Sequence, residues 1–390
     1  MEYHFSNIKG VPLDQNKVLS ACEKLYELLS DDIYAKILSE TGISYEKAKK
    51  QTEEARTLIN PDFLKERIKR ELSGFPFTHN GTRYDIRPVG TILHIAASNA
   101  GAIGAYSVIE GLLTGNRNIV KPSSKDSGIT QKLIDMLTDC EPELKNYIYV
   151  ANVPSSDKYG IMNLIFASNA VCVWGGSEAI RSIRKLCPTD TDIIEWGHRV
   201  SFCYSVKDAD EEALYHIAKN ICDTDQMYCS SCQQIYVDTD DPDDIFSFSE
   251  RFLRILEKTA ENDPHDIFKN AGRTLALKCA EFDGQKVLKG SGCAVIPLND
   301  AFLKSSVYSR CCEIKPLKRE NIYDCLSGFK NKLQTAALIC GKDDEKELSE
   351  LLFNVGVKRI TRPENMDAYS LMHDGEYSLR RYVRITSSDF

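Results

Sequence analysis

Strand-like apolar runs alternate with helix-like segments between residues 90 and 186, and this alternation restricts the fold more than any other feature. Residues 90–96 read as a strand, and residues 103–113 then carry apolar side chains at helical spacing, with Gly115 placed as a helix stop. The same order recurs through "RNIVKPSS", "GITQKLIDMLTD", "YIYVANV" and "NAVCVWGGSEAIRSIRKL". Strands that alternate with helices predict a parallel sheet covered by helices on both faces.

The segments on either side of this region differ from each other. The first 75 residues look polar and helical, and an amphipathic helix is predicted from the three- and four-residue spacing of Val18, Cys22, Leu25, Leu28 and Leu29. From about residue 201 the alternation restarts, with strand-like runs in "QQIYVDT", "GCAVIPL" and "TAALIC". A second α/β domain is therefore expected.

Length, charge and cysteine content exclude several classes of protein. A chain of 390 residues with a net charge of −8 gives no electrostatic reason to expect nucleic acid or an anionic membrane as a partner. No run approaches the roughly 18–20 apolar residues of a membrane span, and residues 1–10 do not resemble a signal peptide. The 14 cysteines are accordingly expected as reduced thiols of a cytoplasmic protein.

Two turns in the first α/β region carry residues suited to binding anions. In "VWGGSEAIRSI", Gly176 and Ser177 stand where a strand ends and a helix begins, and a helix N-terminus binds phosphate. A simple helix cap explains the same residues. In "HIAASNAGAIG" the glycines do not match the G-x-G-x-x-G pattern, but the Asn99 amide is suited to donate to an oxyanion. A tight strand-to-helix turn is the alternative.

Two further strand ends carry a charged residue. In "IVKPSSKDSG", Lys121 precedes proline and two serines, which suits either ribose or phosphate binding or a plain sheet edge. In "IIEWGHRVSF", Glu195 stands beside a tryptophan, where a partly desolvated carboxylate can act as a general base. A solvated loop carboxylate is the equal alternative.

The stretch "DQMYCSSCQQIYV" contains two cysteines three positions apart, Cys229 and Cys232. The spacing is compatible with a redox dithiol, with a nucleophile beside an inert cysteine, or with a zinc site that includes Cys222. No fourth zinc ligand stands at a suitable spacing, so no metal is expected.

The linear order of these segments resembles the aldehyde dehydrogenase superfamily, and the 34 positions between Glu195 and Cys229 suit that family's carboxylate and nucleophile. Within it, "HIAASN", "GLLTGNRNIVKPSS", "CSSCQQIYV", "LQTAAL" and "HDGEYSLRRYVRI" resemble the LuxC-type acyl-CoA reductases, from about residue 81 to the C-terminus. The resemblance implies a Rossmann-type cofactor domain and a second α/β catalytic domain, with a helical N-terminal region. We expect these at residues 81–200, 201–360 and 1–80, with residues 361–390 completing the fold or an oligomer interface.

The resemblance also implies roles for individual residues. Cys229 would be the nucleophile, and the Asn99 side chain and the Cys229 backbone N–H would bind the oxyanion. Glu195 would either assist proton transfer or slowly hydrolyse the acyl-enzyme to the acid. The family usually has proline at the position of Cys232, so this cysteine is expected to be a bystander. The implied cofactor-binding residues are Ser98, Lys121, Ser123, Ser124, Gly176, Ser177 and Glu313.

The implied reaction is reduction of a long-chain acyl thioester, either acyl-CoA or acyl-protein, to the aldehyde. Many NAD-preferring relatives carry glutamate where this chain has Ser124, next to Lys125, so NADPH is expected over NADH. An acyl-protein synthetase partner and a homo-oligomer are also expected. The alternatives are an aldehyde-oxidising dehydrogenase and a non-catalytic acyl-binding protein. His373 and Asp374 belong to the resemblance, but their role is open, and a structural turn explains them equally well.

Overall fold

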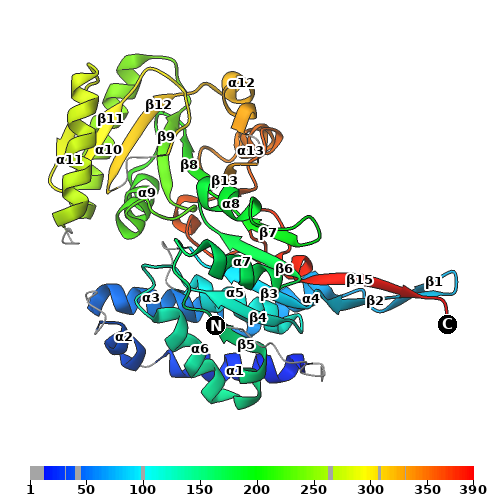
Figure 1. The fold of residues 1–390 in the computed structure, drawn as a ribbon. Helices are drawn as coiled ribbons and strands as arrows, with labels where there is room; N and C mark the ends of the chain where they lie inside the picture. Colours follow the sequence, from blue (N-terminus) through cyan, green and yellow to red (C-terminus); the bar gives the residue numbers. More distant parts are fainter. Residues whose placement is uncertain are drawn as a thin grey trace. The chain divides into compact units, whose positions relative to one another are not determined.

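The computed structural model describes residues 13–30, 32–39, 45–97, 102–261, 267–305, 309–329 and 331–390. The chain divides into two units (Figure 1). Unit 1 contains Met1–Gly197 together with Tyr369–Phe390, and unit 2 contains His198–Ala368. Ser98 and Asn99, two of the predicted site residues, lie outside the described residues.

The centre of unit 1 is a five-stranded parallel sheet in the order β5-β4-β3-β6-β7. Its strands are β3 (Thr91–Ile95), β4 (Arg117–Lys121), β5 (Ile148–Val150), β6 (Ala170–Trp174) and β7 (Asp192–Trp196). Its helices are α5 (Ile103–Leu113), α6 (Ile129–Cys140), α7 (Lys158–Phe166) and α8 (Ser177–Arg184). Leu93 packs with α7 and α8, whereas its neighbour Ile92 enters a cluster on the opposite face. The alternating strand–helix pattern therefore folds as predicted, as a parallel sheet between two helical layers.

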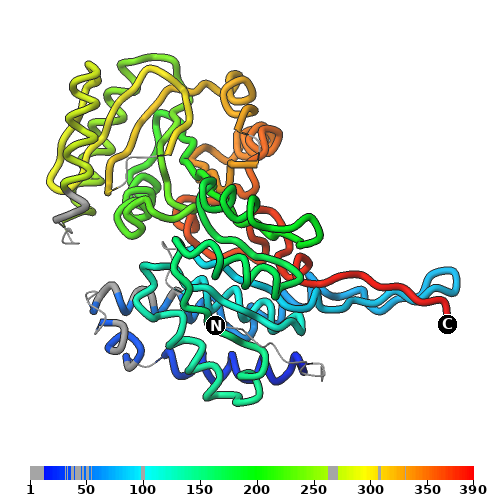
Figure 2. Tube along the Cα trace, in the orientation of Figure 1, coloured from blue at the N-terminus to red at the C-terminus, as the bar shows by residue number. Residues whose placement is uncertain are grey.

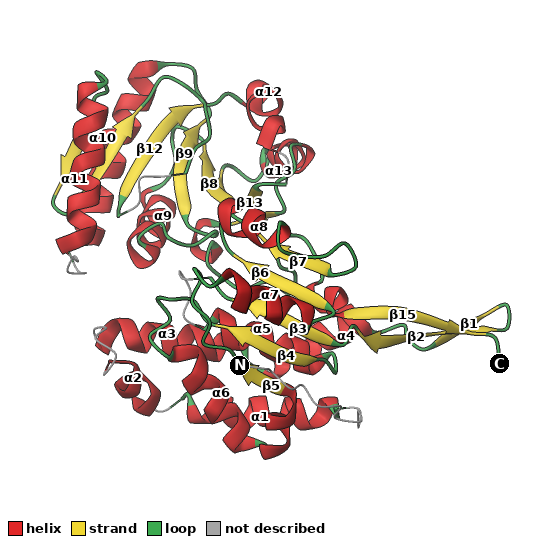
Figure 3. Ribbon diagram, viewed as in Figure 1, coloured by secondary structure: helices red, strands yellow, loops and turns green. Residues whose placement is uncertain are grey.

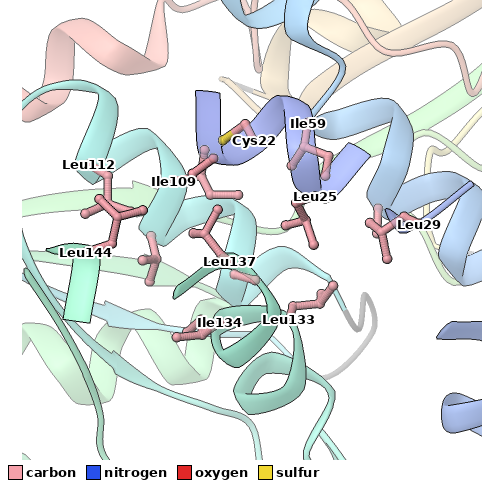
Figure 4. Close-up of a cluster of buried hydrophobic side chains, with 14 of the residues drawn as sticks. Cys22, Leu25, Leu29, Ile59, Ile109, Leu112, Leu133, Ile134, Leu137 and Leu144 are labelled. Atoms are coloured by element: carbon pink, nitrogen blue, oxygen red, sulfur yellow. The ribbon is translucent and has the colours of Figure 1, made fainter. Parts of the chain in front are cut away.

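Four N-terminal helices cover one side of this core. They are α1 (Gln15–Leu28), α2 (Asp32–Ser39), α3 (Tyr45–Leu58) and α4 (Pro61–Leu72). Cys22 and Leu25 of α1 lie in one buried cluster with Ile109 of α5 and Leu137 of α6 (Figure 4). The predicted amphipathic stripe is confirmed except at Leu28, which is 47% exposed. The N-terminal helices thus share a hydrophobic core with the parallel sheet.

Unit 1 also contains an antiparallel sheet that the sequence did not predict. It has the order β1-β2-β15, formed by β1 (Phe77–His79), β2 (Thr82–Pro88) and β15 (Val383–Ser388). The C-terminal strand runs alongside the hairpin near residue 80 (Figure 2), with Val383 opposite Pro88 and Ser388 opposite Arg83. These strands are largely exposed and rich in charge, so they lack the apolar alternation that marks a half-buried strand.

Unit 2 is built on a seven-stranded sheet in the order β10-β11-β12-β9-β8-β13-β14, in which β10 alone is antiparallel among the described strands (Figure 3). The strands are β8 (Val200–Ser205), β9 (Cys232–Val237), β10 (Leu288–Gly290), β11 (Cys293–Pro297), β12 (Cys311–Pro316), β13 (Leu333–Ile339) and β14 (Arg359–Thr361). The helices are α9 (Glu211–Thr224), α10 (Pro242–Ala260), α11 (Ile267–Phe282), α12 (Ile322–Leu326) and α13 (Glu345–Asn354). Along β8, Cys203 packs with α9 and α10, whereas Phe202 packs with α12 and α13. The predicted second α/β domain is confirmed.

Short 3-10 helices complete the described elements: η1 (Pro142–Tyr147), η2 (Arg319–Asn321), η3 (Ser327–Phe329), η4 (Pro363–Asn365) and η5 (Ser378–Tyr382). Within the described ranges, every helix is too short or too polar to cross a bilayer.

Candidate active site

The predicted cofactor-binding residues of unit 1 gather at the carboxyl edge of its parallel sheet. Lys121 is the last residue of β4, and Gly176 and Ser177 follow β6 after one residue. The strand order reverses direction between β3 and β6, since β4 and β5 lie on one side of β3 and β6 and β7 on the other. In open α/β sheets this reversal point, at the carboxyl ends of the strands, is where ligands bind. Glu195, the penultimate residue of β7, lies near the same edge.

The loop after β4 presents polar groups next to a buried lysine. Lys121 is 4% exposed, and its Nζ donates to Ser155 Oγ at 3.1 Å. Burial lowers the pKa of this ammonium group. Ser123 Oγ accepts from the Lys125 backbone N–H at 3.2 Å, while Ser124 and Lys125 are exposed. The exposed part of the loop therefore carries a hydroxyl and a cation.

The turn after β6 leaves a helix N-terminus without a side-chain cap. Gly176 is the N-cap residue of α8, and no side chain accepts from the first amides of this helix. A Cβ built on Gly176 would meet nothing within 4 Å, so the space beside this residue is open. The interpretation of Ser177 as a side-chain cap is wrong, because Ser177 is the first helical residue. The open amides fit a phosphate group.

An aromatic cluster that the sequence did not predict lies beside this turn. Trp174 and Trp196 end neighbouring strands and stack at a ring separation of 5.4 Å. The His373 ring packs edge-on against both, 5.1 Å from Trp174 and 4.8 Å from Trp196. A tight turn with two backbone hydrogen bonds between His373 and Glu376 holds the imidazole there. His373 is therefore next to the carboxyl edge of the sheet, which the sequence could not indicate.

A chain of buried hydrogen bonds fixes the orientation of Trp174. Its Nε1 donates to Ser107 Oγ at 3.0 Å, and this oxygen lies 2.6 Å from His94 Nδ1. His94 Nε2 lies 2.9 Å from Asn118 Oδ1. Because Asn118 Nδ2 donates to the Asn116 carbonyl at 2.9 Å, its Oδ1 is the acceptor, so His94 donates from Nε2 and accepts at Nδ1. Burial lowers the pKa of His94 to about 4, and the ring is neutral at pH 7.

Glu195 is engaged by an arginine in this arrangement. Arg184, the last residue of α8, donates from Nη2 to Glu195 Oε2 at 2.6 Å and from Nε to Oε1. This hydrogen-bonded pairing raises the pKa of the guanidinium group. The carboxylate is thus held by two parallel hydrogen bonds, and neither of the two sequence interpretations included this partner.

In unit 2, Cys229 lies in a loop with an unusual backbone. Helix α9 ends at Thr224, and the next two residues, Asp225 and Gln226, have φ values of 48° and 60°. Left-handed conformations are unfavourable for such residues and are concentrated at functional sites. The Gln226 side chain anchors the loop, since Nε2 donates to the Cys232 carbonyl at 3.0 Å and Oε1 accepts from the Cys311 N–H at 3.0 Å.

The two cysteines of the C-x-x-C stretch have different surroundings. Cys229 is half-buried, and its Sγ accepts from Gln334 Nε2 at 3.3 Å. Cys232 is fully buried in β9, where its thiol donates to the Gln234 carbonyl at 3.3 Å and burial raises its pKa to about 12. Cys222 is buried as well. Among the described residues no group of three or more His, Cys, Asp or Glu is placed to hold a metal ion.

Glu313 is buried in β12, at the level of Gln234 in β9. Two lysines pair with its carboxylate, Lys304 Nζ at 2.7 Å from Oε1 and Lys315 Nζ at 3.0 Å from Oε2. The predicted contact of Glu313 with a ribose would have to compete with both ammonium groups. Lys315 was not singled out by the sequence, although a charged residue in an otherwise buried strand is a usable signal.

Comparisons with known proteins agree on family and fold. The model of the family described as acyl-CoA reductase (LuxC) matches residues 11–385. The chain is 27% identical over 315 residues to the long-chain acyl-protein thioester reductase of Vibrio harveyi. The aligned region covers 77% of this chain and 65% of that protein. The chain therefore spans slightly less than two thirds of this relative.

Solved structures of similar fold include dehydrogenases that act on aldehydes. One is a glyceraldehyde-3-phosphate dehydrogenase from Methanocaldococcus jannaschii complexed with NADP (TM-score 0.75, 14% identity, 96% of this chain and 90% of that one). Another is an aldehyde dehydrogenase from Bartonella henselae (TM-score 0.74, 12% identity, 97% and 87%). The predicted aldehyde-dehydrogenase-like fold is confirmed.

Proposed function

Because the chain belongs to the LuxC family of acyl-CoA reductases, we propose that it reduces a fatty acyl thioester to the aldehyde through an acyl-cysteine at Cys229. The observation that carries this proposal is the contrast between the two thiols. Cys229 is half-buried with an N–H donor at its sulfur, whereas Cys232 is fully buried with a raised pKa. Since the thiolate is the nucleophile, Cys229 is the one suited to attack a carbonyl.

The first step is transfer of the acyl group to the protein. The Cys229 sulfur forms a bond to the carbonyl carbon, the bond between that carbon and the donor sulfur breaks, and the donor leaves as a thiolate that takes a proton from water. The negative charge that develops on the carbonyl oxygen needs hydrogen-bond donors. We assign this role to the Asn99 side chain and to the Cys229 backbone N–H, as the resemblance implies.

The second step needs a nicotinamide cofactor, which when bound supplies a hydride to the acyl carbon. The carbon–sulfur bond then breaks toward sulfur, which releases the aldehyde and regenerates the Cys229 thiolate. The uncapped amides behind Gly176 and Ser177 fit the pyrophosphate, and Lys121 and Ser123 fit the ribose. Ser98 and Glu313 stay part of the proposed cofactor set.

We propose NADPH as the preferred cofactor. Ser124 and Lys125 are both exposed in the loop after β4, and neither would repel a 2′-phosphate. NADH remains the alternative, and the ratio of kcat/KM for the two cofactors decides between them. A clear preference for NADH would refute this assignment.

The pairing of Glu195 with Arg184 favours reduction over aldehyde oxidation. Both oxygens of this carboxylate accept hydrogen bonds from the guanidinium, so fewer of their lone pairs are available to a water molecule. Hydrolysis of the acyl-cysteine, which would waste the substrate, is therefore expected to be slow.

The acyl donor and the assembly state complete the proposal. The name of the Vibrio harveyi relative points to an acyl-protein thioester, and the family description points to acyl-CoA. We propose that this chain accepts a long-chain acyl group from one of these, with an acyl-protein synthetase as the donor partner and a homo-oligomer as the working form. With all 14 cysteines free of disulfides, a reducing cytoplasmic setting is proposed.

Intact-protein mass spectrometry tests this function. The protein is incubated with acyl-CoAs of several chain lengths and with an acyl-protein thioester, and NADPH is then added. We expect one acyl adduct, which is absent in Cys229→Ala, persists in Cys232→Ser and disappears with release of aldehyde after NADPH. Failure of every thioester to acylate the folded protein would refute the proposal.

A further inference from the structure

The two strands that flank β8 each contain one extra residue at the same level. Between β13 and β8, Leu333 pairs with Val200 but Ala336 pairs with Phe202, so β13 advances three residues while β8 advances two. A corresponding shift occurs where β8 meets β9. Bulges of this kind change the direction of a side chain and are frequent next to active sites. The bulge in β13 contains Gln334.

The redirected Gln334 side chain contacts the reactive cysteine. Its Nε2 donates to Cys229 Sγ at 3.3 Å, and the side chain is only 9% exposed. The Ser201 hydroxyl, at the start of β8, lies 3.4 Å from Gln334 Oε1, donates to the Cys229 carbonyl at 2.5 Å and accepts from the Thr335 N–H at 3.1 Å. Ser201 thus joins the Cys229 backbone to β13 by two hydrogen bonds, beside the Gln334 amide.

In this arrangement the NH₂ group of the amide is directed at the sulfur, to which Nε2 donates, and Oε1 lies on the side of the Ser201 hydroxyl. A donor directed at sulfur stabilises the anionic form relative to the neutral thiol, and the effect is stronger in a buried setting. The same contact restricts rotation of the sulfur about the side-chain bond.

We propose that Gln334 is a catalytic residue whose side-chain amide stabilises the thiolate of Cys229 and holds its sulfur in the attacking position. Ser201 is a positioning residue, because its hydroxyl joins the Cys229 carbonyl to the Thr335 N–H of β13 and so holds the sulfur beside the amide. The inference rests on the proposed function only in taking Cys229 as the nucleophile, and it is made within unit 2 alone. It assigns a chemical role to Gln334 in the segment "LQTAAL", for which the family resemblance implied none.

Alkylation of the protein without substrate or cofactor tests the proposal. Iodoacetamide reacts with thiolates, and the rate at Cys229 is followed against pH by mass spectrometry, with fragmentation to separate it from Cys222 and Cys232. The exposed Cys279 in the same sample is the internal reference. The variants are Gln334→Met, which removes the donor at similar volume, and Gln334→Glu, which replaces the donor with a carboxylate. Gln131→Met, on the surface of α6, is the matched control.

We expect Gln334→Met to move the Cys229 profile up by about one pH unit and to lower its rate at pH 7 about tenfold, with Cys279 unchanged. The shift in Gln334→Glu should be larger, and Gln131→Met should behave as wild type. If both Gln334 variants keep native circular dichroism and show the wild-type profile, the proposal is wrong. If both fail to fold, Ser201→Ala, which breaks the hydrogen bonds that hold the Cys229 backbone beside β13, must show a smaller upward shift for the proposal to stand.

The outcome is separable from that of the proposed function. A shifted alkylation profile without acylation by any thioester would support the role of Gln334 and refute the thioester reductase. An acyl adduct at Cys229 together with an unshifted alkylation profile would support the thioester reductase and refute the role of Gln334.

Discussion

Lowering the pH from 7 to 5 is expected to destabilise unit 1, because His94 is buried in its neutral form. The pKa of an ordinary imidazole is 6.5 and burial lowers that of His94 to about 4. Between these values the unfolded chain binds a proton that the folded chain does not. The contribution of the neutral His94 to the free energy of unfolding is therefore fully present above pH 6.5 and is lost as the pH falls from 6.5 toward 4.

The size of the effect follows from these two values. The full difference between these two pKa values corresponds to about 3 kcal/mol, of which about 2 kcal/mol is lost between pH 7 and pH 5. The groups near His94 are Ser107 and Asn118, which bond to its ring, and Glu110, whose charge opposes part of the shift.

Urea unfolding followed by tryptophan fluorescence measures this loss. Both tryptophans of the chain, Trp174 and Trp196, lie in unit 1, so the signal reports the unit that contains His94. In His94→Gln, the decrease in unfolding free energy from pH 7 to pH 5 should be about 2 kcal/mol smaller than in wild type. His79→Gln, which removes an exposed imidazole of β1, should retain the wild-type decrease. A His94→Gln protein with the same pH dependence as wild type would show that the buried ring does not govern it.

Three other substitutions have definite expected outcomes. Gly111→Ala places a Cβ 1.9 Å from Asn118 Oδ1, so urea unfolding should show a loss of about 2 kcal/mol, whereas Gly272→Ala on α11, with open space, should lose nothing. Arg184→Gln removes both hydrogen bonds to Glu195 and should raise the ratio of acid to aldehyde product about two- to fivefold, with Arg181→Gln as the control; an unchanged ratio contradicts the proposed suppression of hydrolysis. Cys232→Ser should keep at least half of the wild-type kcat/KM, because the serine hydroxyl can donate to the Gln234 carbonyl as the thiol does. Loss of activity in a folded variant would favour the dithiol alternative.

The regular α/β parts were predictable because their signals are local. Residues 103–113 have helical spacing with a glycine stop, and the helix has those bounds. The strand expected at residues 90–96 is β3, one residue shorter at each end. Burial of both faces makes such strands continuously apolar, and the sequence shows this directly.

The remaining features depend on contacts between distant residues. Strand β2 has few apolar residues and pairs with β15 about 300 positions away, so apolar alternation does not mark it, although the Asn80–Gly81 turn to β1 is a local hairpin signal. The sulfur contact of Gln334 depends on a bulge, which is a property of strand pairing. Similarly, a carboxylate beside a tryptophan was visible at Glu195, but its partner Arg184 was not. The sequence identified side chains whose chemistry suits catalysis or binding, whereas the contacts of each side chain are seen only in the folded chain.

The pairing of β2 with β15 has a consequence for how the protein is made. Residues 198–368, the whole of unit 2, are translated between these two strands. At about 5–20 residues per second, β2 waits about 15–60 seconds on the ribosome for its partner. Unit 2 is thus able to fold before unit 1 is complete, while β2 keeps an open edge. A chain interrupted before residue 383 would retain that edge, which is a known starting point for aggregation.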